Sequence, residues 1–261
     1  MCFKKAVAKS SGFSRIFAFG LMIFSGAGLI NLCTVCAETT DELQGPPVVQ
    51  SHIIGIDPGH QGPNVDMSDL EPLGPGSTEM KAKASTGTQG TFSGLPEYQL
   101  NLDVALKLRD ELEARGYEVY MIRETNDVDI SNAERAQLAA ESGSDILIRI
   151  HANGSDNTSV AGALTMAPST ANPYLSQEMI AECQKLSQCI ITAFCASTGA
   201  NNQGVYQTDE MSGLNWCSIP ATIVEMGYMT NQEEDTRMQT ADYQQQMVTG
   251  IADGIDQYFA S

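Results

Sequence analysis

The sequence predicts an α/β domain with a mainly parallel sheet. Short apolar runs alternate along the chain with segments whose apolar residues recur every three or four positions, as strands alternate with helices. Several runs are apolar throughout, which is typical of strands covered by helices on both faces of a parallel sheet. The length of 261 residues fits one domain, and no internal repeat is visible.

The first predicted elements are a strand, a long loop and a helix. Residues 52–56 form an apolar run that ends at an Asp-Pro-Gly turn sequence. Residues 61–94 are rich in Gly, Ser, Thr, Pro and Asn, which predicts a long loop. In residues 97–115 a Leu or Val recurs every four positions, so we expect an amphipathic helix that Gly116 ends.

The alternation continues to the C-terminus. Residues 117–123 alternate like a strand, and Ser131 with Glu134 forms a capping box that begins a helix. Residues 145–151 are almost continuously apolar, which predicts a central strand buried on both faces. Three more elements are predicted: a helix over residues 174–198, a strand over residues 221–225 and a last helix with a stripe from Tyr243 to Ile255.

The first 37 residues predict a secretory signal peptide. Four basic residues and no acid precede an apolar run over residues 16–32, and small residues then suit cleavage after Ala37. Residues 38–51 are expected to be a linker, and residues 52–261 the folded domain. The alternative is an uncleaved anchor, because 17 apolar residues are at the short edge of a membrane span.

The charge of the chain excludes some classes of partner. The net charge is −18. Without the signal segment the chain has ten basic and 32 acidic residues, a net charge of −22. Such a protein does not bind nucleic acid or anionic lipid through its overall field. We expect a secreted or cell-wall protein, a monomer, with no nucleic-acid partner and no stable membrane span after cleavage.

Four cysteines follow the signal segment: Cys183, Cys189, Cys195 and Cys217. No pair has the C-x-x-C spacing of a structural zinc site. Export permits disulfides, but four cysteines allow three pairings and the sequence does not choose among them. Because Cys183 lies on the apolar stripe of its predicted helix, we expect a buried free thiol there.

Titratable side chains stand at three predicted strand ends. His60 follows the first strand, His151 ends the central strand and Glu225 ends the late strand, while Glu97 begins the helix after the long loop. Ligand sites of parallel sheets lie at the carboxyl ends of strands, and two His with one Glu is a known catalytic zinc set. The competing interpretation is a set of hydrogen-bonded structural histidines, since no compact H-E-x-x-H run exists. The third histidine, His52, is predicted to be structural or exposed.

Four motifs occur in order: DPGHQG at residues 57–62, PEYQLNL at 96–102, IHAN at 150–153 and IVEMGYMTN at 223–231. In these motifs the chain resembles the zinc-dependent N-acetylmuramoyl-L-alanine amidases of the type-3 family, over residues 52–259. The resemblance implies a single twisted sheet flanked by helices. It implies zinc ligands at His60, Glu97 and His151, a catalytic carboxylate at Glu225, and as substrate the amide between N-acetylmuramic acid and L-alanine in peptidoglycan.

Two departures from the family pattern concern substrate contacts. Arg149 stands two residues before His151, where the family commonly has a serine, and the segment between His60 and Glu97 is long enough for an access loop or lid. We expect Arg149 and Asn153 to contact substrate, although Arg149 can equally pair with an acid such as Glu225.

Two further residues have competing interpretations. Asp57 either makes the turn, which ordinary turn chemistry favours, or orients His60. Trp216 either lines the groove or packs in the core, which is the commoner place for a lone Trp. Two alternative functions also remain: a zinc peptidase that cuts within the stem peptides, and a wall-binding protein without activity.

Overall fold

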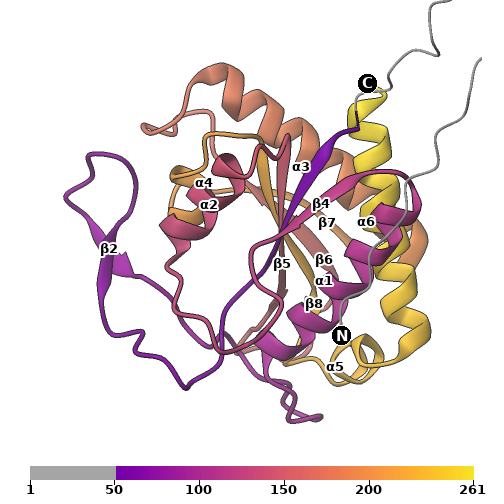
Figure 1. Ribbon diagram of the computed structural model, residues 1–261. Coiled ribbons are helices and arrows are strands. Elements are labelled where there is room, and N and C mark those ends of the chain that lie inside the picture. Colours follow the sequence, from indigo (N-terminus) through magenta and orange to yellow (C-terminus); the bar gives the residue numbers. More distant parts are fainter. Residues whose placement is uncertain (1–50) are drawn as a thin grey trace, which may run out of the picture. The chain divides into compact units, whose positions relative to one another are not determined.

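The computed structural model describes residues 51–261, and its centre is a six-stranded sheet with the order β4-β1-β5-β8-β6-β7 (Figure 1). The predicted signal peptide, and the linker up to Gln50, lie outside the described residues. The strands are β1 (Ile53–Pro58), β4 (Glu118–Met121), β5 (Ile146–Asn153), β6 (Ala163–Ala167), β7 (Asn202–Gln207) and β8 (Ala221–Tyr228). Strands β4, β1, β5 and β8 are parallel, whereas β6 is antiparallel to β8. The sheet is therefore mainly parallel, as predicted.

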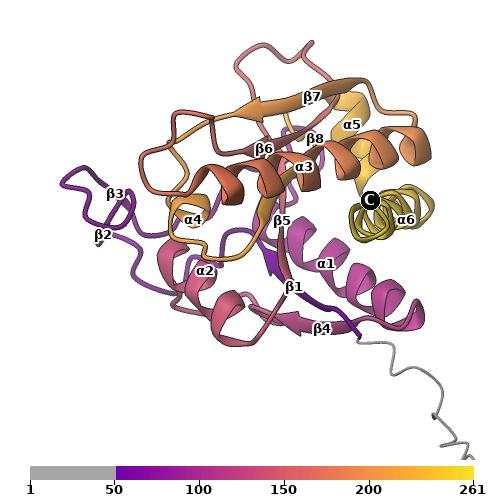
Figure 2. The same cartoon turned by 90° about the horizontal axis from the view of Figure 1, so that it is seen from above.

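Helices cover both faces of the sheet (Figure 2). The larger core packs strand residues against three long helices: α1 (Glu97–Ala114), α3 (Gln177–Thr198) and α6 (Ala241–Phe259). A smaller cluster on the other face packs against α2 (Asn132–Glu141) and the short α4 (Ser212–Asn215). The remaining helix of the described chain, α5 (Gln232–Met238), precedes α6. None of the helices in residues 51–261 combines the length and apolar character that crossing a membrane requires.

Local sequence signals place most of these elements. Ser131 Oγ accepts the backbone N–H of Glu134, and the Glu134 carboxylate accepts that of Ser131, so the predicted capping box begins α2. Gly199 ends α3 in the left-handed conformation, at φ 68°. The observed α1 matches the prediction for residues 97–115 to within one residue.

Strands β6 and β7 were not predicted from the sequence. Strands β6 and β7 are short and lie at one edge of the sheet, and the polar sequence of β7 is largely exposed. Neither shows an apolar pattern longer than five residues, so periodicity alone does not reveal them. The predicted loop over residues 61–94 also contains a small hairpin, β2 (Leu70–Pro72) with β3 (Met80–Ala82).

The side chains of β5 and β8 alternate between two different environments. Ile148 and Ile150 of β5 belong to the larger core, and Val224 of β8 joins them. The residues between them point to the opposite face, since successive strand residues alternate sides. That face therefore receives Arg149 and His151 from β5 and Glu225 from β8, two neighbouring parallel strands.

Candidate metal centre

His60 is held in place by its backbone and by Ser85. It is the only described non-glycine residue with positive φ, at 63°, directly after β1. Its Nδ1 lies 3.2 Å from the Ser85 carbonyl oxygen and 3.0 Å from Ser85 Oγ. Because a carbonyl oxygen only accepts, we assign the proton to Nδ1, which leaves the Nε2 lone pair free for a metal.

Glu97 is the first residue of α1, and its carboxylate is buried. Oε2 accepts the backbone N–H of Thr88 at 2.8 Å, and Oε1 accepts from Ala152 N and Asn101 Nδ2, both at 3.2 Å. Burial raises the pKa of this carboxyl group, but the imidazoles of His151 and His60 beside it outweigh burial and hold the pKa well below its usual range. Glu97 is therefore charged at neutral pH.

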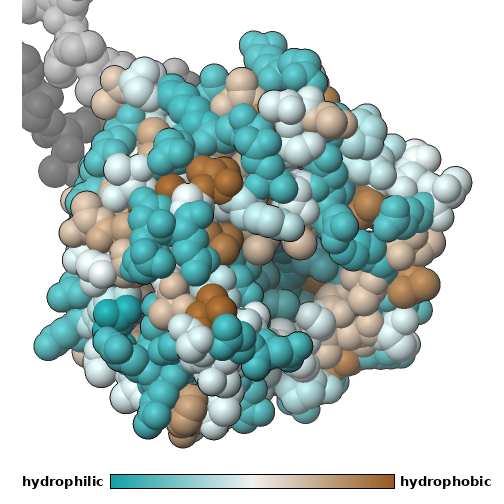
Figure 3. Space-filling model, turned by 180° about the vertical axis from the view of Figure 1, so that it is seen from behind, coloured by the Kyte–Doolittle hydropathy of each residue, from teal (hydrophilic) through white to brown (hydrophobic). Residues whose placement is uncertain are grey.

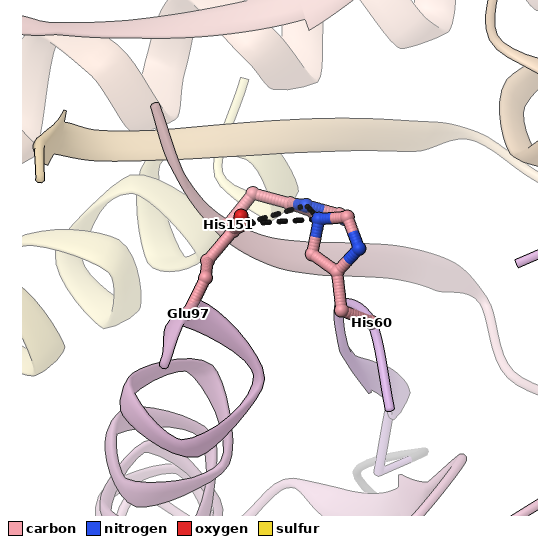
Figure 4. Close-up of side chains that lie close together, drawn as sticks. All are labelled: His60, Glu97 and His151. Carbon is pink, nitrogen blue, oxygen red and sulfur yellow. Dashed lines mark hydrogen bonds and ion pairs between the residues drawn. The ribbon is translucent and has the colours of Figure 1, made fainter. Parts of the chain in front are cut away.

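Three potential ligand atoms converge between these residues (Figure 4). His60 Nε2 lies 3.0 Å from Glu97 Oε1, and His151 Nδ1 lies 3.2 Å from both of these atoms. Donor atoms of a tetrahedral zinc site, with bonds of about 2.0–2.1 Å, are about 3.3 Å apart. The three atoms are therefore spaced like one face of such a tetrahedron.

The protonation state of the cluster also suits a cation. Burial lowers the pKa of His151 to about 4, so its imidazole is neutral at pH 7. Two imidazoles and one carboxylate are the donor set of a His₂Glu zinc site with an open fourth position. The residues present thus fit a zinc ion, and the predicted His60, Glu97 and His151 do come together.

Two glycines allow the chain to approach this cluster closely. A Cβ atom at Gly59 would clash with the His151 ring, and one at Gly87 would clash with the Glu97 carboxylate and the His60 ring. Gly87 also has φ +75°, a conformation that side chains disfavour. The long loop therefore forms part of the wall of the metal centre, with Ser85, Gly87 and Thr88 against it.

Glu225 stands opposite His151 in the register of β5 and β8. Burial, and then the negative charge of Glu97, raise the pKa of its carboxyl group to about 8. Its Oε2 and His151 Nε2 are buried and have no hydrogen-bond partner among the described residues. A buried carboxyl group with a free oxygen beside these potential ligands has the properties of a proton carrier.

A cavity of about 230 Å³ opens beside these residues. The space-filling view from behind shows a hollow whose visible walls are mostly hydrophilic (Figure 3). The walls of the cavity bring together the sheet, the hairpin and α4: His60, Lys81, Ala82, Asn132, Arg149, His151, Met166, Glu210, Met211, Ser212, Gly213, Ile223 and Glu225.

A buried ion-pair network surrounds Asp57. Its carboxylate accepts from Arg135 Nη1 at 2.6 Å and from Arg149 Nε at 2.8 Å. Burial raises the pKa of Asp57, but the two guanidinium groups outweigh burial and hold the pKa well below its usual range. The Asp57 carboxylate therefore contacts the two guanidinium groups and not the His60 ring, so the interpretation that Asp57 orients His60 is wrong. Arg135 instead donates to the backbone carbonyl of His60.

Of the two predicted substrate contacts, the structure places only Arg149 in the cavity wall. Arg149 lines the cavity and pairs with Asp57, so the alternative pairing with Glu225 is wrong. The Asn153 side chain accepts the N–H of Gly154 and is not part of the cavity wall. Trp216 donates to the Pro72 carbonyl and packs on the smaller core, as the packing interpretation expects.

The remaining histidine and the cysteines lie outside the cluster. His52 is half exposed, contacts Asp145 at 3.2 Å and stacks on Phe259, which confirms its structural interpretation. All four cysteines are free thiols, and Cys183 is buried as predicted. Cys217 is buried as well, within the smaller core.

Several residues that hold the centre were missed by sequence reasoning. Asn101 lies one helical turn after Glu97, and this spacing was the only available signal for its contact. Ser85, Gly87 and Thr88 reach the centre from a loop whose sequence shows no periodicity. Glu71 of the hairpin accepts hydrogen bonds from Ser212 Oγ in α4 and from the backbone N–H of Ala133 in α2. The long loop is thus fastened to α2 and α4.

Comparison with known proteins adds independent support. A family model described as N-acetylmuramoyl-L-alanine amidase matches residues 54–257. The chain is 26% identical, over 88% of its length, to the N-acetylmuramoyl-L-alanine amidase LytC of Bacillus subtilis, and spans 39% of that relative. It is 23% identical to an N-acetylmuramoyl-L-alanine amidase of Mycobacterium tuberculosis, with 83% of this chain and 90% of the relative covered.

A solved structure has the same fold. The crystal structure of the N-acetylmuramyl-L-alanine amidase Ami1 from Mycobacterium smegmatis superposes with a TM-score of 0.72 at 25% identity. The superposition covers 80% of this chain and 97% of Ami1. Because the family model spans most of the chain, including the metal centre and Glu225, the protein belongs to the N-acetylmuramoyl-L-alanine amidase family.

Proposed function

We propose that this protein is a zinc-dependent hydrolase that cleaves the amide between N-acetylmuramic acid and L-alanine in peptidoglycan. The convergence of His60 Nε2, Glu97 Oε1 and His151 Nδ1 within 3.2 Å, beside a cavity, carries the proposal. Family membership gives the substrate class, since the related proteins are named for this amide. The chain covers only 39% of LytC, so the activity is proposed for this domain alone.

His60, Glu97 and His151 would hold the zinc ion. When bound, zinc polarises a carbonyl group and lowers the pKa of water to about 7. Thr88, Ala152 and Asn101 hold the Glu97 carboxylate through hydrogen bonds, and Ser85 fixes the ring of His60. These contacts keep the ligands in place before an ion arrives, which strengthens metal binding.

Glu225 is the proposed general base and acid. Its free Oε2 lies in the cavity wall next to the ligands, where it can take a proton from water and deliver it to the leaving amine of L-alanine. Its buried position favours the neutral form after the proton has been taken up, because desolvation disfavours the carboxylate. Arg149 is proposed to contact the substrate in the cavity, and Asn153 is proposed to do so from the end of β5.

We further propose that the protein acts outside the cell, at the wall. The basic, apolar and small-residue pattern of residues 1–37 supports export, with cleavage after Ala37 and a catalytic domain over residues 52–261. Peptidoglycan is the proposed partner, and we propose a monomer. Sequencing the N-terminus of the secreted protein tests the cleavage site directly.

The central test is digestion of peptidoglycan with the purified chain, with and without a chelator, followed by mass spectrometry. We expect free stem peptides that begin at L-alanine, their loss with chelator and their return with added zinc. Fragments cut within the stem would instead identify a zinc peptidase. Bound zinc with no products at all would identify a wall-binding protein without activity.

A further inference from the structure

The buried network around Asp57 carries more positive than negative charge. One carboxylate, fully buried, serves two guanidinium groups, Arg135 and Arg149, whose side chains are only 2% and 3% exposed. Arg135 Nη2 donates to the His60 carbonyl and to the Gln61 side chain, neither of which is charged. A buried cation without a full counter-charge is costly, so a second anion beside this network would be favourable.

Arg149 is the member of the network that faces the cavity. Its Nε donates to Asp57 and its Nη2 to Asn132, whereas Nη1 makes no hydrogen bond to any described residue. Nη1 lies against Gly213 at the start of α4, where a Cβ atom would clash with it. Both residues line the cavity, so the absence of a side chain at Gly213 leaves room for the guanidinium in the cavity wall.

A second cation lines the same cavity. Lys81, at the centre of β3, donates to the Glu210 backbone carbonyl and has no carboxylate within 4.0 Å in the described structure. Its neighbour Lys83 is different, because it pairs with Asp69 and Asp129. Two acids also line the cavity: Glu225 at the metal end, and Glu210, whose carboxylate pairs with no described cation.

The position of Arg149 relative to the metal centre suggests which anion fits. Arg149 and His151 lie on one face of β5, and two strand residues span about 6.6 Å. In the proposed substrate, the α-carbon of the second stem residue follows that of L-alanine by about 3.8 Å. A carboxyl group on that residue therefore lies about 6–8 Å from the scissile carbonyl carbon.

We propose that Arg149, assisted by Lys81, forms a subsite for the free α-carboxylate of the second stem residue, a γ-linked D-glutamate. The subsite selects stems that keep this acid over stems in which it is amidated. This inference rests on the proposed function, because it takes the scissile amide to lie at the metal centre. A guanidinium donates to a carboxylate through charge-assisted hydrogen bonds, which an amide replaces with weaker ones.

The test uses two synthetic muropeptides that differ only in a carboxylate or a carboxamide at this position. For the zinc-loaded wild-type chain we expect kcat/KM to be roughly 10–100-fold higher for the acid, as for one charged hydrogen bond. Arg149→Gln should bring the ratio close to one by slowing hydrolysis of the acid, and Arg149→Lys should restore part of it. A wild-type ratio near one would overturn the subsite.

Matched variants keep the test decisive if Arg149→Gln fails to fold. Lys81→Gln should lower the acid-to-amide ratio, whereas Lys83→Gln, on a lysine outside the cavity, should leave it unchanged. Zinc content and thermal unfolding are measured for each variant. An unchanged ratio in Lys81→Gln together with an equal loss of both activities in Arg149→Lys would also overturn the subsite.

A binding measurement separates the subsite from the proposed reaction. Calorimetry with the zinc-loaded Glu225→Gln variant gives the Kd of each muropeptide without turnover. Tighter binding of the acid supports the subsite even if the wild-type chain hydrolyses neither compound, a result that would refute only the proposed function. Equal Kd values for the acid and the amide would overturn the subsite whatever the activity.

Discussion

The two faces of the central sheet differ in composition and in what they contribute. The face covered by α1, α3 and α6 is packed with aliphatic side chains such as Ile54, Ile148 and Val224. The face covered by α2 and α4 has a smaller apolar cluster and, beside it, Asp57, Arg149, His151 and Glu225. The same strands supply both sets, because alternate residues point to opposite sides.

This difference shows how one sheet can provide stability and chemistry at once. Burial of apolar surface stabilises the fold without directional requirements, so the first face can tolerate many residue choices. The second face buries charges that are stable only with partners at hydrogen-bond distance. We therefore expect substitutions on the first face to reduce stability alone. Substitutions on the second face should reduce activity or metal affinity and, where they break a buried ion pair, stability as well.

The largest expected effect is on the catalytic carboxylate. Glu225→Gln should lower kcat by roughly 10²–10⁴-fold, as expected for loss of a general acid–base, while the zinc content stays unchanged. The apo variant should be no less stable than the wild type, because it removes a buried carboxyl group whose pKa is raised to about 8. Steady-state kinetics and metal analysis check this. An active Glu225→Gln variant would refute the role of Glu225 as general base and acid.

The next effect compares a buried ion pair on the second face with an ion pair on the surface. Asp57→Asn leaves two buried guanidinium groups without their carboxylate and should cost roughly 3–5 kcal/mol of unfolding free energy. The surface control Asp253→Asn loses only a half-exposed contact to Arg115 and should cost roughly 0–1 kcal/mol. Urea unfolding measures both. Equal values for the two variants would contradict the distinction.

The same pair predicts how stability depends on pH. The folded pKa of Asp57 is well below its unfolded value of about 3.9, so the ionised carboxylate stabilises the fold. This contribution is complete above the unfolded pKa and is lost as the pH falls through the folded one. Between about pH 5 and pH 2, stability should therefore fall more steeply for the wild type than for Asp57→Asn. If the stability of the wild type and of Asp57→Asn fell in parallel over this pH range, the stabilising role of the ionised Asp57 would be refuted.

The apolar face should respond in the opposite way to the catalytic one. Leu108→Ala removes a fully buried side chain and should cost roughly 2–5 kcal/mol, with kcat and zinc content of the folded fraction unchanged. Leu70→Ala, at a side chain that is 60% exposed, should change stability by less than about 0.5 kcal/mol. A loss of zinc in folded Leu108→Ala would show that the two faces are coupled.

The smallest effect concerns the thiols. Cys183 lies on α3 and Cys217 in the smaller core, and burial raises their pKa values to about 11 and about 12. Neither should react with a thiol reagent at pH 8 unless the protein opens locally. Because its cluster is smaller, Cys217 should become modified sooner than Cys183, and mass spectrometry of partly labelled protein gives the order. Earlier labelling of Cys183 would reverse the ranking of the two faces.

The sequence by itself determined the elements that local patterns encode. The apolar periodicity of α1, the capping box of α2 and the uniform apolar run of β5 each depend on residues a few positions apart. The placement of His60, His151 and Glu225 late in or after apolar strands follows from the same patterns, and the ordered motifs then indicated their roles. The predicted ends at His151 and Glu225 were too early, because β5 continues to Asn153 and β8 to Tyr228. These features are readable because a helix or a strand repeats its contacts along the chain.

Only the tertiary structure decided which distant side chains meet. It paired Arg149 with Asp57 instead of Glu225, left Asn153 outside the cavity wall and brought Ser85 to His60. It also revealed the short strands β6 and β7, whose pairing depends on neighbouring strands more than on their own sequence. Such contacts join segments far apart in the chain, and their energies depend on burial and on exact partners, which no local pattern records.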